Sequence, residues 1–526
     1  MTLHSLRAAL LLGLPLSVAG GADAQCLLQK LSSSATAPHL GSILYQAGVS
    51  VALEGDRLFV GVQGDDVAEL DGGSVLAYEH TGGSWTQTAV LLPSPAAPGI
   101  SFGFRLALEG DTLAVGAADE AVYVFEHQGG SWVQTQRLTA SDSHPDDGFG
   151  IHLALSGDTL LVGAAGSDGP GSGAGAAYVF ERVAGSWVQT QVLLPADPAP
   201  LVFFGGDVAL EGDVAAVAAP LHHAGAGVVY VFERAGGSFG QVAKLFASNA
   251  APGGALGRAL ALDGGALAAA SAGAKTAHVF EQLGCAWTET ALIQPPAPAF
   301  SVAAVDLDGD RLALGTNLDS TGGASAGATR VYERTAGVWV PSAVLVAPDA
   351  APGDLAGSRV ALDGDTVVAA APQDVAPDTF LGSVQVWSLA GAGCPSLYGS
   401  PAQLSAAAGG TQSLLLAPGP GFGGAPYLVL GSLSGTAPGT PAGGLTIPLT
   451  FDAYTALSLA APNAPPFQDT LGTLSAAAQA GAAIVLPAPS PPALVGLEAH
   501  HAYVLLDLAA GALPFASNAV ALRFGL

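Results

Sequence analysis

The chain has 526 residues, of which 50% are hydrophobic and 11% are charged, and its formal net charge is −27. A polyanion such as DNA or RNA would be repelled by this acidic balance, so we exclude nucleic acid as a partner. The 72 glycines and 36 prolines argue against a helical protein and favour many short strands joined by turns.

The first residues have the pattern of a secretory leader. Arg7 supplies a basic start, residues 8–19 are apolar, and Ala22-Asp23-Ala24 is a small-x-small cleavage signal. We therefore expect a signal peptide over residues 1–24 and a protein that is secreted or held at the cell surface. No later stretch is apolar enough for long enough to predict a transmembrane span.

A phrase built on Gly-Asp then returns along the chain. The pair occurs at Gly55-Asp56, Gly110-Asp111, Gly157-Asp158, Gly212-Asp213, Gly309-Asp310 and Gly364-Asp365, and Gly264-Gly265 fills the one gap. Each copy is followed by a strand-like run such as VYVFEH, and most by a turn before an aromatic residue such as Trp132. Seven units of this kind indicate a closed repeat array.

Each unit contains four expected strands. In the second unit they are 105–108, 112–116, 121–125 and 132–138. The middle two are apolar on both faces, so they must be covered on both sides. Seven four-stranded sheets stacked radially satisfy this requirement, and we predict an all-β, seven-bladed β-propeller.

The repeated phrase FG…VGAA…VYVF resembles the FG-GAP repeat of integrin-α-like propellers, in a short-turn bacterial form. Phe102-Gly103, Phe149-Gly150 and Phe204-Gly205 match the first half of the motif, and Ala218-Ala219-Pro220 and Ala370-Ala371-Pro372 approximate the second. The resemblance covers residues 26 to 393 and implies an adhesion-type binding protein.

The seventh unit lacks an outer strand. The segment CLLQKL at 26–31 resembles the outer-strand segment TQRL at 135–138, so we expect an N-terminal strand to complete blade seven. Cys394 follows the third strand of that blade, and a Cys26–Cys394 disulfide would lock the closure; three unpaired thiols are the alternative. Cys285 is expected to be a small buried residue.

Tight turns such as EGD and GGS should share one face, and long variable loops the other. Binding residues tend to lie on loops carried by a rigid scaffold, so the variable face is the candidate ligand-binding face. Its candidate residues are Asp65, Asp66, Glu69, Asp71, Asp142, His144, Asp146, Asp147, His222 and His223. The alternative is that these are solvated acidic loops with no ligand.

Calcium is expected to be absent from the tight turns, although many relatives of this type bind it there. The turn LEGDT is too short to surround an ion, and the nearest approach to a calcium loop, Asp306-Leu307-Asp308-Gly309-Asp310, lacks its closing acid. Asp142, Asp146 and Asp147 remain weak candidates for a divalent metal, and no other cofactor is expected.

The sequence gives only weak matches to catalytic motifs. The run from Gly323 to Gly327 matches GxSxG around Ser325, but it falls between two expected strands, where no strand-to-helix elbow can form. The recurring tryptophans could stack on sugars, but a fixed position in every unit favours packing between blades.

Residues 395–526 lack the Gly-Asp phrase and are almost free of charge. Apolar runs such as PYLVLG and HAYVLLDL predict a β-sandwich-like domain after the propeller, which occupies residues 25–394. This part loosely resembles a C-terminal module of other secreted bacterial proteins.

The expected function is a non-enzymatic, monomeric propeller that binds a protein or glycan through its variable loops. Two alternatives remain open. One is a polysaccharide-active hydrolase or lyase with carboxylates at the propeller axis, and the other is a purely structural envelope component.

Overall fold

The computed structural model describes residues 26–32, residues 47–389 except 82–83, 169–170, 285, 300, 348–349 and 375–381, and the C-terminal strands between residues 397 and 525. The predicted leader at 1–24 and the thiols of Cys285 and Cys394 lie outside the described residues. Cys26 is described for its backbone alone, so the predicted disulfide stays a prediction.

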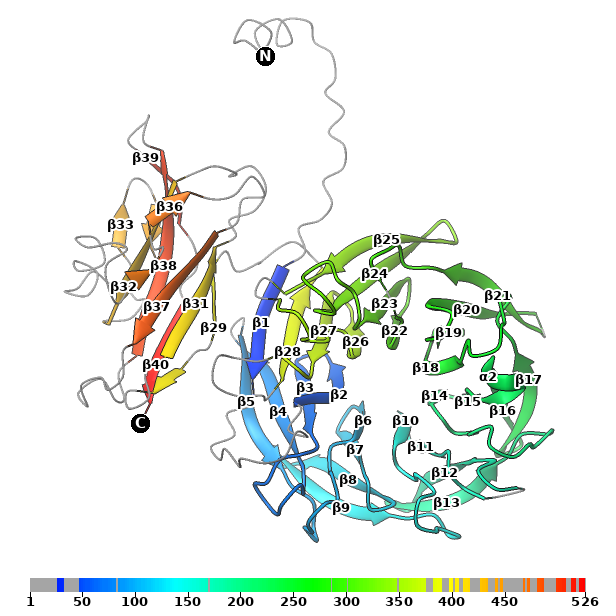
Figure 1. Cartoon of the computed structure of the whole chain (residues 1–526). Coiled ribbons are helices and arrows are strands. Elements are labelled where there is room, and N and C mark those ends of the chain that lie inside the picture. The colour runs from blue at the N-terminus through cyan, green and yellow to red at the C-terminus, as the bar shows by residue number, and fades with distance from the viewer. Residues whose placement is uncertain are drawn as a thin grey trace, which may run out of the picture.

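Seven antiparallel sheets of four strands surround one axis, as the repeat predicted (Figure 1). Blades one to three are β2 (Ala47–Glu54), β3 (Arg57–Val62), β4 (Ser74–Thr81) and β5 (Ser84–Leu91); β6 (Arg105–Glu109), β7 (Thr112–Ala117), β8 (Ala121–Gln128) and β9 (Ser131–Leu138); and β10 (His152–Ser156), β11 (Thr159–Ala164), β12 (Ala176–Val183) and β13 (Ser186–Leu193). Blades four to six are β14 (Val208–Glu211), β15 (Val214–Ala219), β16 (Val228–Ala235) and β17 (Ser238–Leu245); β18 (Leu256–Asp263), β19 (Ala266–Ser271), β20 (Thr276–Leu283) and β21 (Ala286–Ile293); and β22 (Ala304–Asp308), β23 (Arg311–Thr316), β24 (Ala328–Thr335) and β25 (Val338–Leu345). Blade seven is β26 (Arg359–Asp363), β27 (Thr366–Ala371), β28 (Ser383–Ser388) and β1 (Cys26–Ser32), and a short turn, α2 (His222–Gly225), precedes β16.

The burial of each strand follows its sequence pattern. The second and third strands, such as β7 and β8, bury five consecutive residues, because neighbouring blades cover both of their faces. The outer strand β9 alternates exposed and partly buried residues. Trp132 packs edge-on against Phe59 of the preceding blade, with 4.9 Å between ring centroids, so the recurring aromatic serves packing between blades as predicted.

The glycines of the FG and GA phrases lie against each other. Gly103 has a φ of 91°, which favours glycine, and its carbonyl oxygen would be 2.0 Å from a Cβ added to Gly61 of the preceding blade. Gly150 makes the same approach to Gly116, where the distance would be 1.9 Å. The adjacent Phe102 is fully buried. Glycine at both positions therefore allows the segment that leads into one blade to pack closely against the second strand of the preceding blade.

The N-terminal strand β1 closes the ring. It pairs antiparallel with β28, with Leu31 opposite Val384, as Leu138 lies opposite Val122 in blade two. The Gln29 side chain accepts from the Trp85 amide at 2.8 Å and donates to the Trp85 carbonyl at 2.9 Å. Gln136 makes the same pair of bonds to Trp187. Residues 26–31 thus hold the position of an outer strand, as predicted.

A ring of hydrogen bonds between neighbouring blades links the tight turns. The side chain that ends each inner strand accepts a hydrogen bond from the turn amide of the next blade. The seven pairs are Glu54 with Gly110, Glu109 with Gly157, Ser156 with Gly212, Glu211 with Gly264, Asp263 with Gly309, Asp308 with Gly364, and Asp363 with Gly55. The last pair joins blade seven to blade one, so the side chain before each turn glycine, an acid in six blades and Ser156 in the third, is part of the closure.

The C-terminal residues form further strands, and two of these strands contain most of the predicted apolar runs PYLVLG and HAYVLLDL. One sheet contains β29 (Leu397–Ser400), β31 (Gly410–Leu416), β37 (Ala480–Leu486) and β35 (Phe467–Gln468). A second contains β30 (Gln403–Ser405), β40 (Val520–Gly525), β38 (Glu498–Asp507), β32 (Pro426–Ser432) and β36 (Leu471–Thr473), with β39 (Ala512–Ala516) beside β38. A hairpin pairs β33 (Thr440–Ala442) with β34 (Leu445–Ile447). Face-to-face packing of the two sheets as a sandwich stays a prediction.

Candidate functional site

The two faces of the propeller differ as the sequence predicted. Because each blade is an antiparallel meander, the EGD turns and the turns between third and fourth strands lie at one end. The amide of His80 donates to the Asp56 carbonyl at 2.8 Å, which ties these two turns together in blade one. The variable loops and the links between blades lie at the opposite end, which we call the loop-bearing face.

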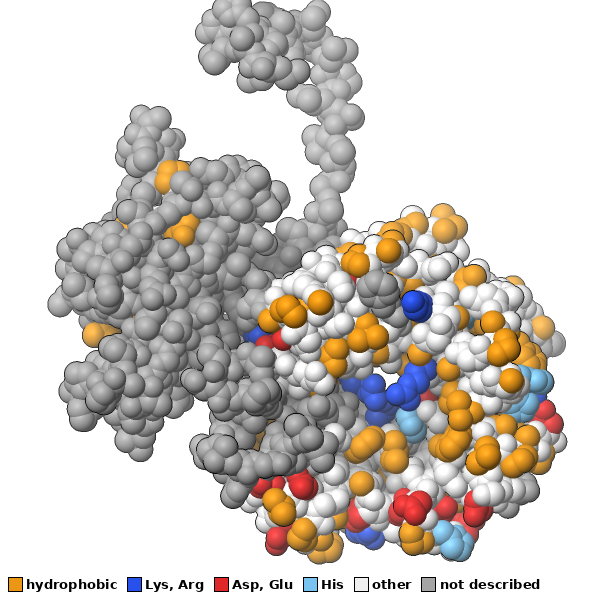
Figure 2. All heavy atoms as spheres, viewed as in Figure 1, with side chains coloured by type: hydrophobic (Ala, Val, Ile, Leu, Met, Phe, Trp, Pro, Cys, Tyr) orange, Lys and Arg blue, Asp and Glu red, His pale blue; other side chains and the backbone are white. Residues whose placement is uncertain are grey.

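A cavity of about 270 Å³ follows the propeller axis and is lined by the inner strands of all seven blades. Each inner strand begins at the loop-bearing face and runs toward a tight turn. The side chains near its beginning therefore form the mouth of the channel on the loop-bearing face. In Figure 2, Lys or Arg side chains and a histidine gather around the hollow at the axis. The lining places Arg105, His152, Arg258 and Arg359 at this mouth.

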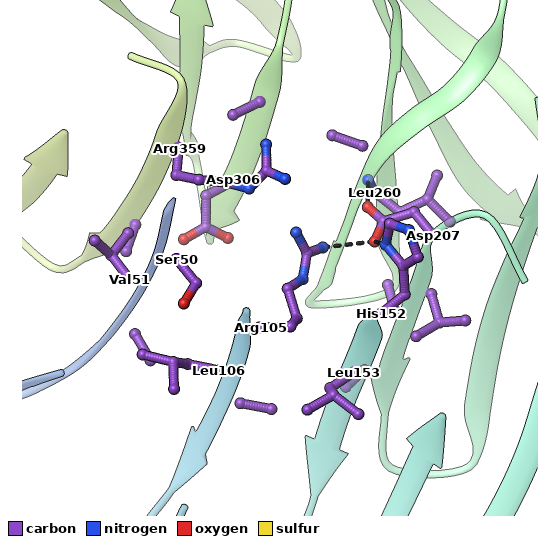
Figure 3. Close-up of a pocket in the computed structure, with 18 of the residues that line it drawn as sticks. Ser50, Val51, Arg105, Leu106, His152, Leu153, Asp207, Leu260, Asp306 and Arg359 are labelled. Atoms are coloured by element: carbon purple, nitrogen blue, oxygen red, sulfur yellow. Dashed lines mark hydrogen bonds and ion pairs between the residues drawn. The ribbon is translucent and has the colours of Figure 1, made fainter. Parts of the chain in front are cut away.

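Asp207 is the buried acid of the mouth, with 1% of its surface exposed. It accepts from Arg105 Nη2 at 2.5 Å, lies 2.9 Å from His152 Nδ1, and accepts from the Leu260 amide at 2.8 Å (Figure 3). Burial alone would raise the pKa of Asp207, but Arg105 and these hydrogen bonds outweigh it and hold the pKa well below its usual range. Asp207 is therefore an ionised acceptor with three partners already in place.

His152 is neutral near pH 7. Burial lowers its pKa, and the hydrogen bond to Asp207 does not reverse the shift, since Arg105 and Arg359 also lie nearby. A neutral imidazole beside an ionised carboxylate donates from Nδ1. The mouth thus contains three guanidinium groups and one carboxylate, a local excess of positive charge in a chain with 15 Lys and Arg residues and a net charge of −27.

Arg359 is incompletely paired. Its Nη1 donates to the Ser358 carbonyl at 3.0 Å, and its Nε is buried without a hydrogen-bond partner among the described residues. Burial, with Arg105 adding repulsion, lowers the pKa of Arg359 to about 10, so it remains charged at neutral pH. Its side chain points into the cavity in Figure 3.

A second cavity, of about 380 Å³, adjoins the mouth and shares Arg258 and Arg359 with it. Its other polar lining residues come from the links and loops of blades five to seven. They are Ser301, Asn317, Ser358 and Gln373. Ser301 donates to Asn317 Oδ1 at 2.7 Å, so the two side chains are held in place. Hydroxyl and amide groups therefore extend from the arginines across the loop-bearing face.

Asp306 lies deeper in the channel and breaks the repeat. The equivalent position is alanine in the other six blades: Ala52, Ala107, Ala154, Ala209, Ala261 and Ala361. Its two oxygens accept from the amides of Leu307 at 3.0 Å and Leu362 at 2.8 Å. Burial raises the pKa of Asp306 to about 7, against the smaller opposing effect of these two hydrogen bonds.

The first acidic loop is held largely by its own contacts. Asp65 is buried and accepts from the Ser74 hydroxyl at 2.5 Å and the Val67 amide at 3.1 Å. Asp66 accepts from the Asp71 amide at 2.7 Å. Glu69 alone among the four predicted acids of this loop is strongly exposed. Two of the four carboxylates, those of Asp65 and Asp66, therefore help to shape the loop.

The second acidic loop keeps more exposed groups. Asp147 is buried and accepts from the His144 amide at 2.9 Å. Asp142, His144 and Asp146 are exposed on the loop-bearing face. Neither loop gathers three metal-ligating side chains around one point, and the same holds for the rest of the described residues.

The predicted histidine pair lies in a short turn of the loop-bearing face. His222 and His223 form the short turn α2, with His223 at a φ of 52°, and their ring centroids lie 4.4 Å apart. His222 is buried and His223 packs against Phe246. The left-handed backbone turns the chain sharply and brings the two rings together at an interplanar angle of 54°.

Sequence reasoning did not single out the mouth of the channel. One signal was present: aligned on Gly-Asp, the units place Ser50, Arg105, His152, Asp207 and Arg359 at one position, where a structural repeat would keep one residue type. The same alignment would have shown Asp306 among alanines. Ser325, by contrast, lies in the loop between β23 and β24, as expected for a chance GxSxG match.

Within the described part of the chain, no helix is long and apolar enough to cross a membrane.

Comparisons with known proteins give one family match and several distant solved structures. The FG-GAP repeat family matches residues 85–125, 132–180, 187–232 and 339–387. No curated protein matches the chain. Among solved structures, a chain of a mitotic checkpoint complex is 14% identical with a TM-score of 0.45, covering 69% of this chain and 91% of its own. A Lactobacillus plantarum protein is 18% identical with a TM-score of 0.43, covering 57% and 84%, and Saccharomyces cerevisiae Sqt1 is 12% identical with a TM-score of 0.39, covering 66% and 83%.

Each matched segment begins at an outer strand and ends in the third strand of the next blade, the same offset by which β1 completes blade seven. The chain thus contains an all-β, seven-bladed propeller of four-stranded blades, four segments of which match the FG-GAP repeat.

Proposed function

We propose that this chain is an exported, non-enzymatic binding propeller that holds a protein or glycan partner on its loop-bearing face. The observation that carries the proposal is the difference between the two ends of the propeller in which side chains are already bonded and which groups are accessible. At the tight turns, the side chains that end the inner strands are engaged in the ring of bonds between blades, and exposed aspartates such as Asp158 and Asp213 pair with arginines. The loop-bearing face has exposed carboxylates, a polar channel mouth and an adjoining cavity.

The proposal has a direct test with matched variants. The full chain is probed on glycan arrays and in pull-downs, alongside a variant with Asp142→Asn and Asp146→Asn on the loop-bearing face. The control variant carries Asp158→Asn and Asp213→Asn at exposed tight turns. We expect binding to weaken in the first variant or in variants of the channel mouth, and to persist in the control. A partner whose binding only the control variant weakens would refute the proposed face.

A polysaccharide-active hydrolase or lyase is the second candidate, because His152, Asp207 and Asp306 all line the axial cavity. Asp207 is held ionised by Arg105, which makes it a poor acid. The test is release of reducing ends or unsaturated uronate from acidic polysaccharides, with Asp306→Asn and Asp207→Asn as variants. Turnover that either substitution abolishes would replace the binding proposal. A purely structural envelope component would show neither turnover nor a saturable ligand.

A further inference from the structure

The mouth of the axial channel has more positive charge than its own acids neutralise. Three arginines, Arg105, Arg258 and Arg359, line the mouth together with Asp207, and of the three only Arg105 is bonded to its carboxylate. That carboxylate already has Arg105, His152 and the Leu260 amide as partners. The guanidinium groups of Arg258 and Arg359 therefore lack a carboxylate partner among the described residues of the cavity.

The two arginines are placed by different features of the fold. Arg359 begins β26, and its buried Nε has no hydrogen-bond partner among the described residues. Arg258 is exposed and lies in an irregular part of β18, where the register with β19 shifts between Leu256 and Leu260. Such a bulge redirects a side chain that regular pairing would place elsewhere. Both side chains also line the second cavity.

The lining of the second cavity defines what surrounds the charge. Ser301, Asn317, Ser358 and Gln373 offer hydroxyl and amide groups that can donate and accept hydrogen bonds. Val302, Leu355 and Pro372 add apolar surface between them. This mixture suits a ring with several hydroxyl groups, while paired guanidinium donors suit a compact oxyanion such as a carboxylate or sulfate.

We propose that the two cavities joined at Arg258 and Arg359 form one binding site for an acidic sugar, whose carboxylate or sulfate contacts the arginines and whose hydroxyl groups face Ser301, Asn317 and Gln373. The inference rests on the proposed binding function and names the ligand chemistry of the same face. Repulsion among the three arginines falls when the anion binds, which adds to the hydrogen bonds that it accepts.

The experiment is calorimetric titration of the full chain at low ionic strength with sodium glucuronate, glucose 6-sulfate and glucose. We expect the two acidic sugars to bind and glucose to show no saturable heat. Arg258→Gln and Arg359→Gln should each raise the dissociation constant by about tenfold, the usual effect of losing one charged hydrogen bond. Arg258 is exposed, so its variant should fold normally. Arg311→Gln, at the tight-turn face, is the matched control and should bind like the parent.

Equal binding of glucose, or acidic sugars that bind both arginine variants as tightly as the parent, would overturn the site. Inorganic sulfate serves as a further probe, and binding of sulfate without either acidic sugar would overturn the assignment to carbohydrate. If acidic sugars fail while the arrays or pull-downs still find a partner, this inference falls and the binding function stands. If the arrays and pull-downs find nothing and glucuronate binds at the arginines, the proposed macromolecular partner falls instead.

Discussion

Replacing Asp306 by alanine restores the residue that the other six blades have at this position, and we expect the change to stabilise the propeller at high pH. The pKa of Asp306 is raised to about 7 in the fold from an ordinary 3.8. The folded state therefore keeps its proton through a range in which the unfolded chain has lost it. Stability contributed by the wild-type residue falls as the pH rises from about 4 to 7, and the whole penalty is present above pH 7.

The size of the effect follows from the shift. About three pKa units correspond to about 4 kcal/mol as an upper limit. Asp306 keeps partial contact with solvent in the channel, which reduces the penalty. Alanine also removes the acceptor of the Leu307 and Leu362 amides, at a total cost of about 1–2 kcal/mol. We expect Asp306→Ala to raise the unfolding free energy by about 1–3 kcal/mol at pH 8, and to leave it unchanged or slightly lower at pH 4.5.

The assay is urea unfolding at both pH values, followed by tryptophan fluorescence. All six tryptophans lie between residues 85 and 387, so the signal reports on the propeller. Asp306→Asn, which removes the charge at nearly constant volume, should show the same pH dependence. Asp308→Ala is the matched control, since it removes the acceptor of the Gly364 amide and should destabilise at both pH values. An Asp306→Ala effect that is identical at pH 4.5 and pH 8 would refute the reasoning.

Four further outcomes are expected. Deleting Cys26–Ser32 should lower the free energy of unfolding by at least about 4 kcal/mol, because Leu27 and Leu31 are both buried in the core; a deletion that unfolds like the parent would contradict the closure by β1. Glu109→Ala should cost about 1 kcal/mol in the same measurement, because the Gly157 amide loses its acceptor, whereas Glu109→Gln should recover most of it. Gly150→Ala should be strongly destabilising, since its φ is 91° and the added Cβ would lie 2.8 Å from the Ala121 carbonyl oxygen. Gly129→Ala, with a φ of 59° and open space around the added Cβ, should cost about 1 kcal/mol of unfolding free energy. Equal losses of unfolding free energy in the two variants would remove the steric explanation. Thermal melting in 1 mM calcium and in excess chelator should coincide, and a calcium-dependent rise would show that the short turns or acidic loops do hold a metal.

The candidate site was predictable in part. The acidic loops lie on the loop-bearing face, as predicted, because alternate strand directions in a four-stranded meander decide which turns share an end. Their roles were harder to predict from charge alone. Asp65 and Asp147 are buried acceptors that shape their loops, whereas Asp142 and Asp146 are exposed. Residue type is the same in both cases, and only the local path of the chain separates a structural carboxylate from an accessible one.

The sequence by itself determined the architecture. A strand that is apolar on both faces must be covered on both sides, and seven such units with short turns leave a radial stack as the solution. Even the closure was readable, because Gln29, Lys30 and Leu31 repeat the order found at the end of β9. Only the tertiary structure decided the chemistry at the axis. Arg105, Arg258 and Arg359 are about a hundred or more residues apart along the chain, and one inner strand from each blade must reach the axis before their charges act on a common point.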